Sequence, residues 1–141
     1  DDAVSLSTMK ASKFYGSFKP RIDKWEFALA LVSEVIELIL TVQRKWIYLE
    51  SIFMASEDIC KQLPKESALF IEVNTTFTSI MSSAAKRPNA IVQCTASGML
   101  ESVNGMDEKL EAIQKSLDSC LYVFPKGTKC SIVQIKSFQK A

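Results

Sequence analysis

The chain has 141 residues, with 17 Lys and Arg against 16 Asp and Glu, no histidine, and 48% hydrophobic residues. This length and composition are typical of one globular domain rather than a disordered chain. The absence of histidine excludes Ser-His-Asp and Cys-His nucleophile systems and His-ligated zinc. The four glycines (Gly16, Gly98, Gly105 and Gly127) lie too far apart to form a phosphate-binding loop. We therefore expect no catalytic, cofactor-binding or metal-binding residue in this chain.

Cysteine spacing and the first residues indicate the compartment. No two cysteines form the C-x-x-C pair that grips zinc or exchanges thiols. Residues 1–5 lack the basic and apolar pattern of a secretory signal. We expect an intracellular, reducing setting with free thiols. The cysteines are Cys60, Cys94, Cys120 and Cys130.

Charge divides the chain unevenly. Residues 1–121 carry 13 basic and 16 acidic side chains, whereas residues 122–141 carry four lysines and no acid. We expect three parts: an irregular lead-in at 1–19, a helical region at 20–121 and a basic tail at 122–141. Spaced lysines without arginine favour a solvated tail over one that binds nucleic acid or anionic lipid. Residues 130–135 are a candidate for a short strand.

One long helix is predicted from residue 20, with Pro20 in its first turn. Two adjacent apolar lines follow at helical spacing, so more than half of the circumference is apolar and neighbours are expected on two sides. Glu34 and Glu37 interrupt the apolar run, which excludes a membrane span of ~20 residues. The first line is Trp25, Leu29, Val32, Ile36, Ile39, Trp46 and Phe53, and the second is Ala28, Leu31, Val35, Leu38, Val42, Leu49 and Ile52.

Shorter helices are predicted next. Ser56 before two acids suggests a helix that runs to about Leu63, and Pro64 opens another that Pro88 stops. Residues 89–98 are expected to form a turn or a single helical turn. The inward positions of the helix after Pro64 are Leu69, Val73, Phe77, Ile80 and Ala84.

The last helix has the clearest pattern, because its apolar residues alternate at spacings of four and three as in a coiled coil. Gly105 within it costs about 1 kcal/mol relative to alanine, which we expect a tertiary contact to offset. The fold class is therefore all-α: an elongated helical bundle segment with one long helix, short connecting helices and a coiled-coil-like last helix. The seam consists of Met99, Val103, Met106, Leu110, Ile113, Leu117 and Cys120.

Two arrangements are candidates for a catalytic or nucleic-acid-binding site, and neither is favoured. The carboxylate pairs Glu34 with Glu37 and Glu57 with Asp58 have no second element that must face them across a cleft. The aromatic residues beside Arg44 and Lys45 suggest nucleic-acid stacking, but Trp46 continues the apolar line. Tyr48, on the polar stripe, is the one aromatic side chain here that is a candidate partner contact.

The ordered residues resemble a known family. Trp25-Glu26, Glu34 to Leu38, and the run from Leu40 through Gln43, Trp46 and Tyr48-Leu49-Glu50 to Ile52-Phe53 are similar to the linker region of dynein heavy chains. The likeness extends over residues 1–121 and departs at the end, where Leu121 to Pro125 lead into Lys126-Gly127. It continues with Ser56 to Ile59, Gln62 to Pro64, Phe70, Ile80-Met81, Lys86 to Asn89, Gly98 to Glu101 and Leu110 to Leu117.

The resemblance implies a mechanical role. The chain would be a fragment or truncated isoform of an axonemal dynein heavy chain linker, which couples AAA+ ATPase cycles to microtubule-based ciliary movement. Its partners would be the rest of the heavy chain with its ring and other dynein subunits. Microtubules would be contacted only through the parent motor, and neither nucleic acid nor membrane is expected. The implied location is the cytoskeleton of the cytoplasm, in the ciliary or flagellar axoneme.

The chain itself is then not an enzyme, because no family catalytic residue has a matching position and the ATP-driven motor would be the parent. The alternative function is a free-standing helical interaction module that binds a partner helix through the seam from Met99 to Cys120.

Overall fold

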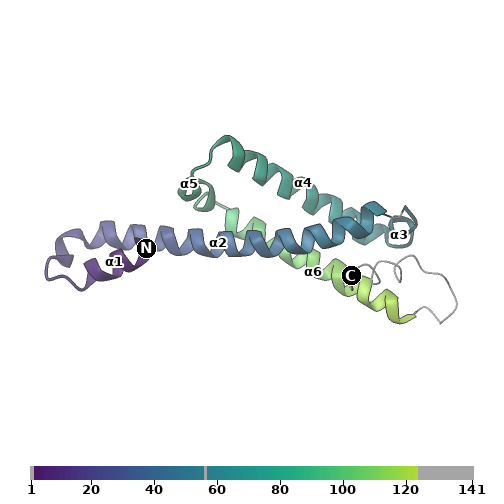
Figure 1. Ribbon diagram of the computed structural model, residues 1–141, viewed down its shortest axis with the longest axis horizontal. Helices are drawn as coiled ribbons and strands as arrows, with labels where there is room; N and C mark the ends of the chain where they lie inside the picture. The colour runs from purple at the N-terminus through teal and green to yellow at the C-terminus, as the bar shows by residue number, and fades with distance from the viewer. Residues whose placement is uncertain (1, 56, 124–141) are drawn as a thin grey trace, which may run out of the picture.

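A computed structural model describes residues 2–55 and 57–123, which form six helices and no strand (Figure 1). The predicted all-α class is confirmed. The helices are α1 (Asp2–Lys10), α2 (Tyr15–Ala55), α3 (Glu57–Gln62), α4 (Pro64–Lys86), α5 (Ala90–Cys94) and α6 (Met99–Val123).

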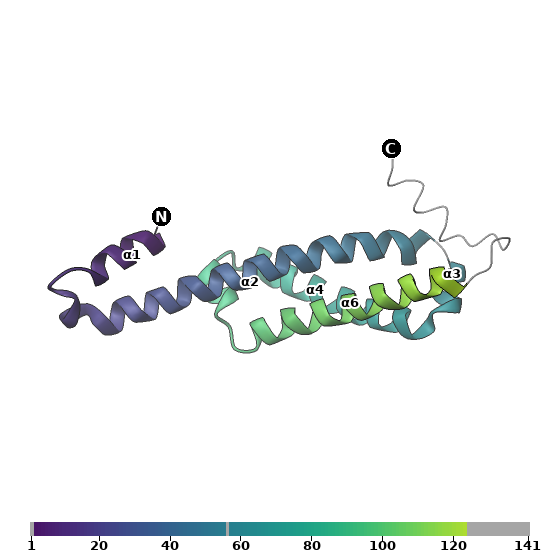
Figure 2. The ribbon, with the colours of Figure 1, turned by 90° about the horizontal axis from the view of Figure 1, so that it is seen from below.

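The long helix α2 is the axis of the molecule. Its 41 residues span about 60 Å at ~1.5 Å per residue. α6 packs along it and against α4, while α1 folds back beside its beginning (Figures 1 and 2). The result is an elongated bundle segment. α2, α4 and α6 share one core along the half of α2 nearer its C-terminus.

The expectation of an irregular lead-in at residues 1–19 is wrong. Residues 2–10 form α1, and α2 begins at Tyr15, five residues before Pro20. A proline near the start of a helix removes one backbone hydrogen bond, and here it does not end the helix. Residues 2–10 have no sustained apolar period, and α1 lies against α2. No rule of local sequence reports that contact.

The predicted helix boundaries further along the chain are confirmed. Pro64 is the first residue of α4, which ends at Lys86, just before Pro88. Asn89 caps α5, because its side-chain oxygen accepts a hydrogen bond of 3.1 Å from the backbone N–H of Val92. Gly98 precedes α6 with a φ of 79°, a left-handed conformation that glycine adopts without steric cost.

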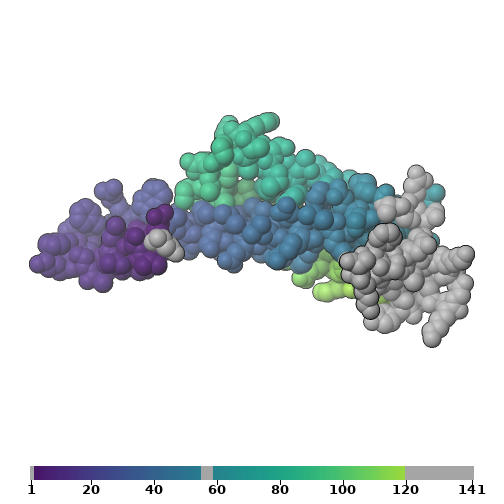
Figure 3. Space-filling model, viewed as in Figure 1, coloured from purple at the N-terminus to yellow at the C-terminus, as the bar shows by residue number. Residues whose placement is uncertain are grey.

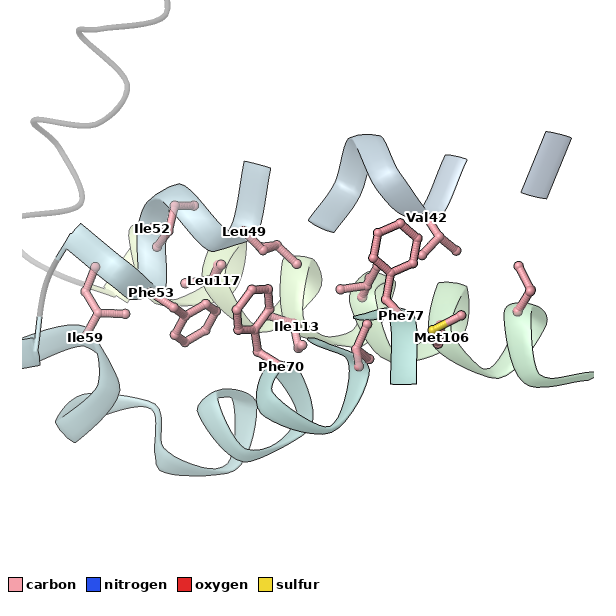
Figure 4. Close-up of a cluster of buried hydrophobic side chains, with 13 residues drawn as sticks. Val42, Leu49, Ile52, Phe53, Ile59, Phe70, Phe77, Met106, Ile113 and Leu117 are labelled. Atoms are coloured by element: carbon pink, nitrogen blue, oxygen red, sulfur yellow. The ribbon is translucent and has the colours of Figure 1, made fainter. Parts of the chain in front are cut away.

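The hydrophobic core lies where α2, α4 and α6 meet (Figure 4). Phe53 on α2 stacks on Phe70 of α4 with ring centroids 5.3 Å apart, and Trp46 lies against Phe77 at 5.5 Å. Burying such side chains is the main stabilising contribution to the bundle. The buried residues of this core are Val42, Leu49, Ile52, Phe53, Ile59, Phe70, Val73, Phe77, Val103, Met106, Leu110, Ile113 and Leu117.

The coiled-coil-like seam of α6 is confirmed as a buried stripe. From Val103 to Leu117 its residues are at most 3% exposed, and they pack against α2 and α4 of the same chain. The alternative function, in which this seam binds a partner helix, is therefore wrong for the described residues. The side chain of Cys120 lies outside the part of the chain that the structure describes.

The neighbours expected on two sides of α2 are present over part of its length, because α6, α5 and α4 contact it, and Trp46 and Phe53 of the first line pack against α4. The second apolar line is buried at Val35, Val42, Leu49 and Ile52, whereas the first line is covered only in part. Trp25 is 48% exposed and Ile36 is 42% exposed. α2 therefore keeps an apolar surface that no described residue covers.

None of the described helices combines the length and the hydrophobicity that crossing a bilayer demands. α6 includes Tyr122 and Val123, the first two residues of the segment predicted as a basic tail at 122–141. The rest of the tail, with the candidate strand at 130–135, lies outside the described residues.

Candidate functional site

A charged contact joins α2 to α6. The Lys45 ammonium donates hydrogen bonds to Oδ1 of Asp107 at 2.7 Å and to Oε1 of Glu111 at 3.0 Å. The two carboxylates are four residues apart, so they lie on one face of α6 and reach the same cation. The Lys45 and Asp107 side chains are 31% and 21% exposed. The contact is partly shielded from solvent at the edge of the core.

The electrostatics of this contact favour its charged state. Partial burial lowers the pKa of Lys45, but hydrogen bonds and charges from Asp107 and Glu111 outweigh it, so the pKa is raised above 10.5. The hydrogen bond from Lys45, then its charge and that of Lys115, lower the pKa of Glu111 below 4.5. Lys45 and Glu111 are therefore both ionised at neutral pH.

Two further polar contacts join α4 to α2 and to α6. Trp46 on α2 donates its indole N–H to Asn74 on α4 at 3.1 Å. Lys109 on α6 forms an ion pair of 2.7 Å with Glu72 on α4. Each pair among α2, α4 and α6 thus has a directional contact beside the core. Such contacts fix how the helices slide and rotate against one another, which apolar packing specifies less strictly.

Of the two carboxylate pairs considered in the sequence, the structure describes the side chains of one. Glu34 and Glu37 are both exposed on α2. The side chains of Glu57 and Asp58 lie outside the described part. Within residues 2–55 and 57–123, no three His, Cys, Asp or Glu side chains gather closely enough to hold a metal ion.

The described cysteines have the environment of structural residues. Cys60 and Cys94 are free thiols, half-buried and buried respectively. Burial raises the pKa of the Cys94 thiol above 9.0, which keeps it protonated and unreactive at neutral pH.

Tyr48 is half-buried and packs against the edge of the core rather than standing free. It lines a groove of about 430 Å³ beside Arg44, Lys45 and Leu110. The Arg44 guanidinium donates to the Thr41 hydroxyl at 3.3 Å on its own helix. Tyr48 as a partner contact therefore stays a prediction.

One surface was missed by the sequence reasoning. A cavity of about 460 Å³ opens between α1 and the first turns of α2, and we call it the hairpin pocket. Phe14, Phe18, Ile22 and Trp25 are spaced by four, four and three, so the helical face continues across Pro20. The spacing is visible in the sequence, but a proline suits the first turn of a helix, so the pattern before Pro20 is not assigned to the same helix. The pocket is lined by Leu6, Met9, Ser12, Phe14, Tyr15, Phe18, Arg21, Ile22 and Trp25.

Comparison with known proteins decides the family. Residues 1–123 match the family model described as dynein heavy chain, N-terminal region 2. The chain belongs to the dynein heavy chain family. The predicted resemblance over residues 1–121 is thereby confirmed.

Similar dynein heavy chains come from algae and mammals. This dynein segment is 51% identical over 121 residues to the Chlamydomonas reinhardtii dynein-1-beta heavy chain of the flagellar inner arm I1 complex, covering 86% of the segment. It is 50% identical over 130 residues to dynein axonemal heavy chain 2 of Mus musculus and 49% identical to that of Homo sapiens, each covering 89% of the segment. In each case the match spans 3% of the relative's length.

Proposed function

We propose that this dynein segment is part of the linker of an axonemal heavy chain, a mechanical element that couples AAA+ ATPase cycles to ciliary movement along microtubules. The observation that carries the proposal is the match of residues 1–123 to the N-terminal region of dynein heavy chains. The linker assignment itself rests on the resemblance of the ordered motifs from Trp25 to Leu117.

The described geometry suits a mechanical element. An unbroken helix of 41 residues supplies length, and α4 and α6 brace it along a common core. Lys45, Trp46 and Lys109 hold the three helices in register through directional contacts. A close-packed interior resists deformation, so displacement at one end of such a bundle is transmitted to the other.

We also propose that the segment hydrolyses no ATP by itself. Its glycines supply no phosphate-binding loop, and the ATPase activity would belong to the ring of the parent motor. The basic tail, beginning after Val123, is proposed to be a part separate from the helical region.

Partners and location follow from the same proposal. The relatives are named as axonemal or flagellar proteins, and this supports a place in the ciliary or flagellar axoneme. The partners would be the rest of the heavy chain with its ring and other dynein subunits. Microtubules would be reached only through the parent motor, with neither nucleic acid nor membrane as a partner.

A chimaeric motor tests the linker role. Residues 1–123 would replace the matching segment of the Chlamydomonas dynein-1-beta heavy chain, and ATP hydrolysis and microtubule gliding would be measured together. We expect the chimaera to move microtubules. Leu110→Asp, which places a charge at a fully buried position, should slow gliding far more than it slows ATP hydrolysis.

The matched control is Ser79→Asp, at an exposed position of α4, which should leave gliding unchanged. A chimaera that glides equally well with Leu110→Asp would rule out a mechanical role for this bundle. ATP hydrolysis by the isolated 141-residue chain would contradict the proposal that the segment is not an enzyme.

A further inference from the structure

The hairpin pocket is an apolar hollow with aromatic walls at one end of the molecule. α1 folds back on α2 at this end (Figure 2), and the N-terminal residues, coloured purple, lie at one end of the molecule (Figure 3). Phe14 is 65% exposed, Phe18 51% and Trp25 48%. Large aromatic side chains left open around a cavity of about 460 Å³ are typical of a surface that binds a partner.

Polar contacts hold this hairpin in shape. Lys10 at the end of α1 pairs with Glu26 on α2. The Tyr15 hydroxyl donates to Asp23 at 2.8 Å, and Lys19 pairs with the same carboxylate at 2.6 Å. Of these contacts, the Lys10–Glu26 pair joins α1 to α2, whereas the two contacts of Asp23 lie within α2 and order the first turns that form one wall of the pocket.

The charge left at the pocket is positive. Arg21 lines it, and the Lys13 ammonium lies 5.1 Å from the centroid of the pocket-lining Phe14 ring. Neither cation forms an ion pair with any other residue in the described ranges, whereas Lys10 and Lys19 are neutralised by Glu26 and Asp23. An occupant must therefore bring apolar side chains for the walls and anionic groups for the rim.

We propose that the hairpin pocket docks an acidic amphipathic helix of a partner protein. Apolar side chains spaced three and four residues apart on such a helix would enter between α1 and α2. Carboxylates on its flanks would reach Arg21 and Lys13, giving charge-assisted hydrogen bonds to the guanidinium. The surface is a property of this chain and goes beyond the proposed linker role.

The same charges argue against a second copy of the chain as the occupant. A two-fold contact would bring each pocket against its equivalent, so Arg21 and Lys13 would face cations of the same kind. The hollow between α1 and α2 suits side chains that project from a helix better than a flat lipid surface.

A direct binding measurement tests the proposal with the full 141-residue chain. The probe is a fluorescent 18-residue helical peptide with Leu and Phe on one face and Glu on the other. Two reference peptides replace every Glu by Lys or every apolar residue by Ser. We expect the acidic amphipathic peptide to bind, with an affinity that falls as salt is raised, and both reference peptides to bind at least roughly tenfold more weakly.

Variants then locate the site. Arg21→Glu should weaken binding of the acidic peptide about tenfold and strengthen binding of the Lys peptide, a reversal that unfolding would not produce. Trp25→Ala should weaken both. The control is Lys65→Glu in the first turn of α4, which carries the same charge change at an exposed, distant position and should have no effect.

Four results would overturn the proposal. One is equal binding of the acidic and Lys peptides, and another is binding that Arg21→Glu leaves unchanged. A third is stronger binding to vesicles of anionic phospholipid or to single-stranded DNA than to the acidic peptide. The last is a dimer in sedimentation that Trp25→Ala disrupts, since this would assign the surface to a second copy.

Discussion

Gly105 is half-buried in the second turn of α6. A tertiary contact was expected to offset its low helix propensity, but a Cβ built at this position would meet no atom within 4 Å. No neighbour therefore requires the absence of a side chain here, and the buried seam residues beside it, Val103 and Met106, supply the tertiary packing. The helix simply carries the cost of glycine.

Gly105→Ala should therefore raise the free energy of unfolding by about 1 kcal/mol, because alanine loses less backbone entropy in a helix. Urea denaturation followed by circular dichroism would measure it. Gly98→Ala is the matched comparison and should destabilise the chain, since Gly98 has a φ of 79° that alanine adopts only with strain. Equal effects of the two substitutions would contradict this account.

The ion pair at Glu111 predicts a dependence on pH. The folded-state pKa of Glu111 is lowered, so its ionised form stabilises the fold above the ordinary value of 4.5. This contribution is lost as pH falls through the lowered pKa. The melting temperature of the parent chain should exceed that of Glu111→Gln at pH 6, and the difference should shrink as pH falls below 4.5.

Glu108→Gln is the control, because Glu108 is exposed on the same helix and forms no ion pair with another described residue. Its melting temperature should follow that of the parent chain across the same range. A difference for Glu111→Gln that persists at low pH would mean that the substitution acts through packing rather than charge.

At the scale of the element, the buried seam of α6 contributes strongly to the stability of the bundle. Leu110 is fully buried between α2 and α4. Leu110→Ala should lower the free energy of unfolding by about 2–5 kcal/mol, the loss typical of a large core side chain. Leu40→Ala on α2, where the leucine is 51% exposed, should have a much smaller effect. Denaturant unfolding of both variants would measure the contrast.

Some of the apolar residues of α2 are buried in the core and others are exposed on the surface. Its pattern is apolar over more than half of its circumference, and the line from Val35 to Ile52 is buried in the core, which Trp46 and Phe53 of the other line also reach. The other line is exposed at Trp25 and Ile36, and Leu40 and Ile47 are exposed beside it. A helical pattern reports that a face is apolar, and it does not report which neighbour covers that face.

At the scale of the whole molecule, the chain is elongated and keeps an uncovered apolar surface along α2 and at the hairpin pocket. It spans 3% of the length of the dynein heavy chains it matches. The chain thus leaves apolar surface exposed and matches a small part of long motor proteins. Both observations are consistent with a segment that works within a larger assembly. The chimaeric motor tests that view where the segment would act.

The sequence by itself determined the helical class, the boundaries at Pro64, Pro88 and Gly98, the α6 seam and the family. These depend on local backbone rules and on periodicity, which neighbouring residues along the chain carry. The tertiary structure alone decided that α1 is a helix, that α2 passes through Pro20, and which positions of the two apolar lines on α2 are covered. It also brought Lys45 to Asp107 and formed the hairpin pocket. Those features arise from contacts between residues distant in sequence, where packing outweighs local preference.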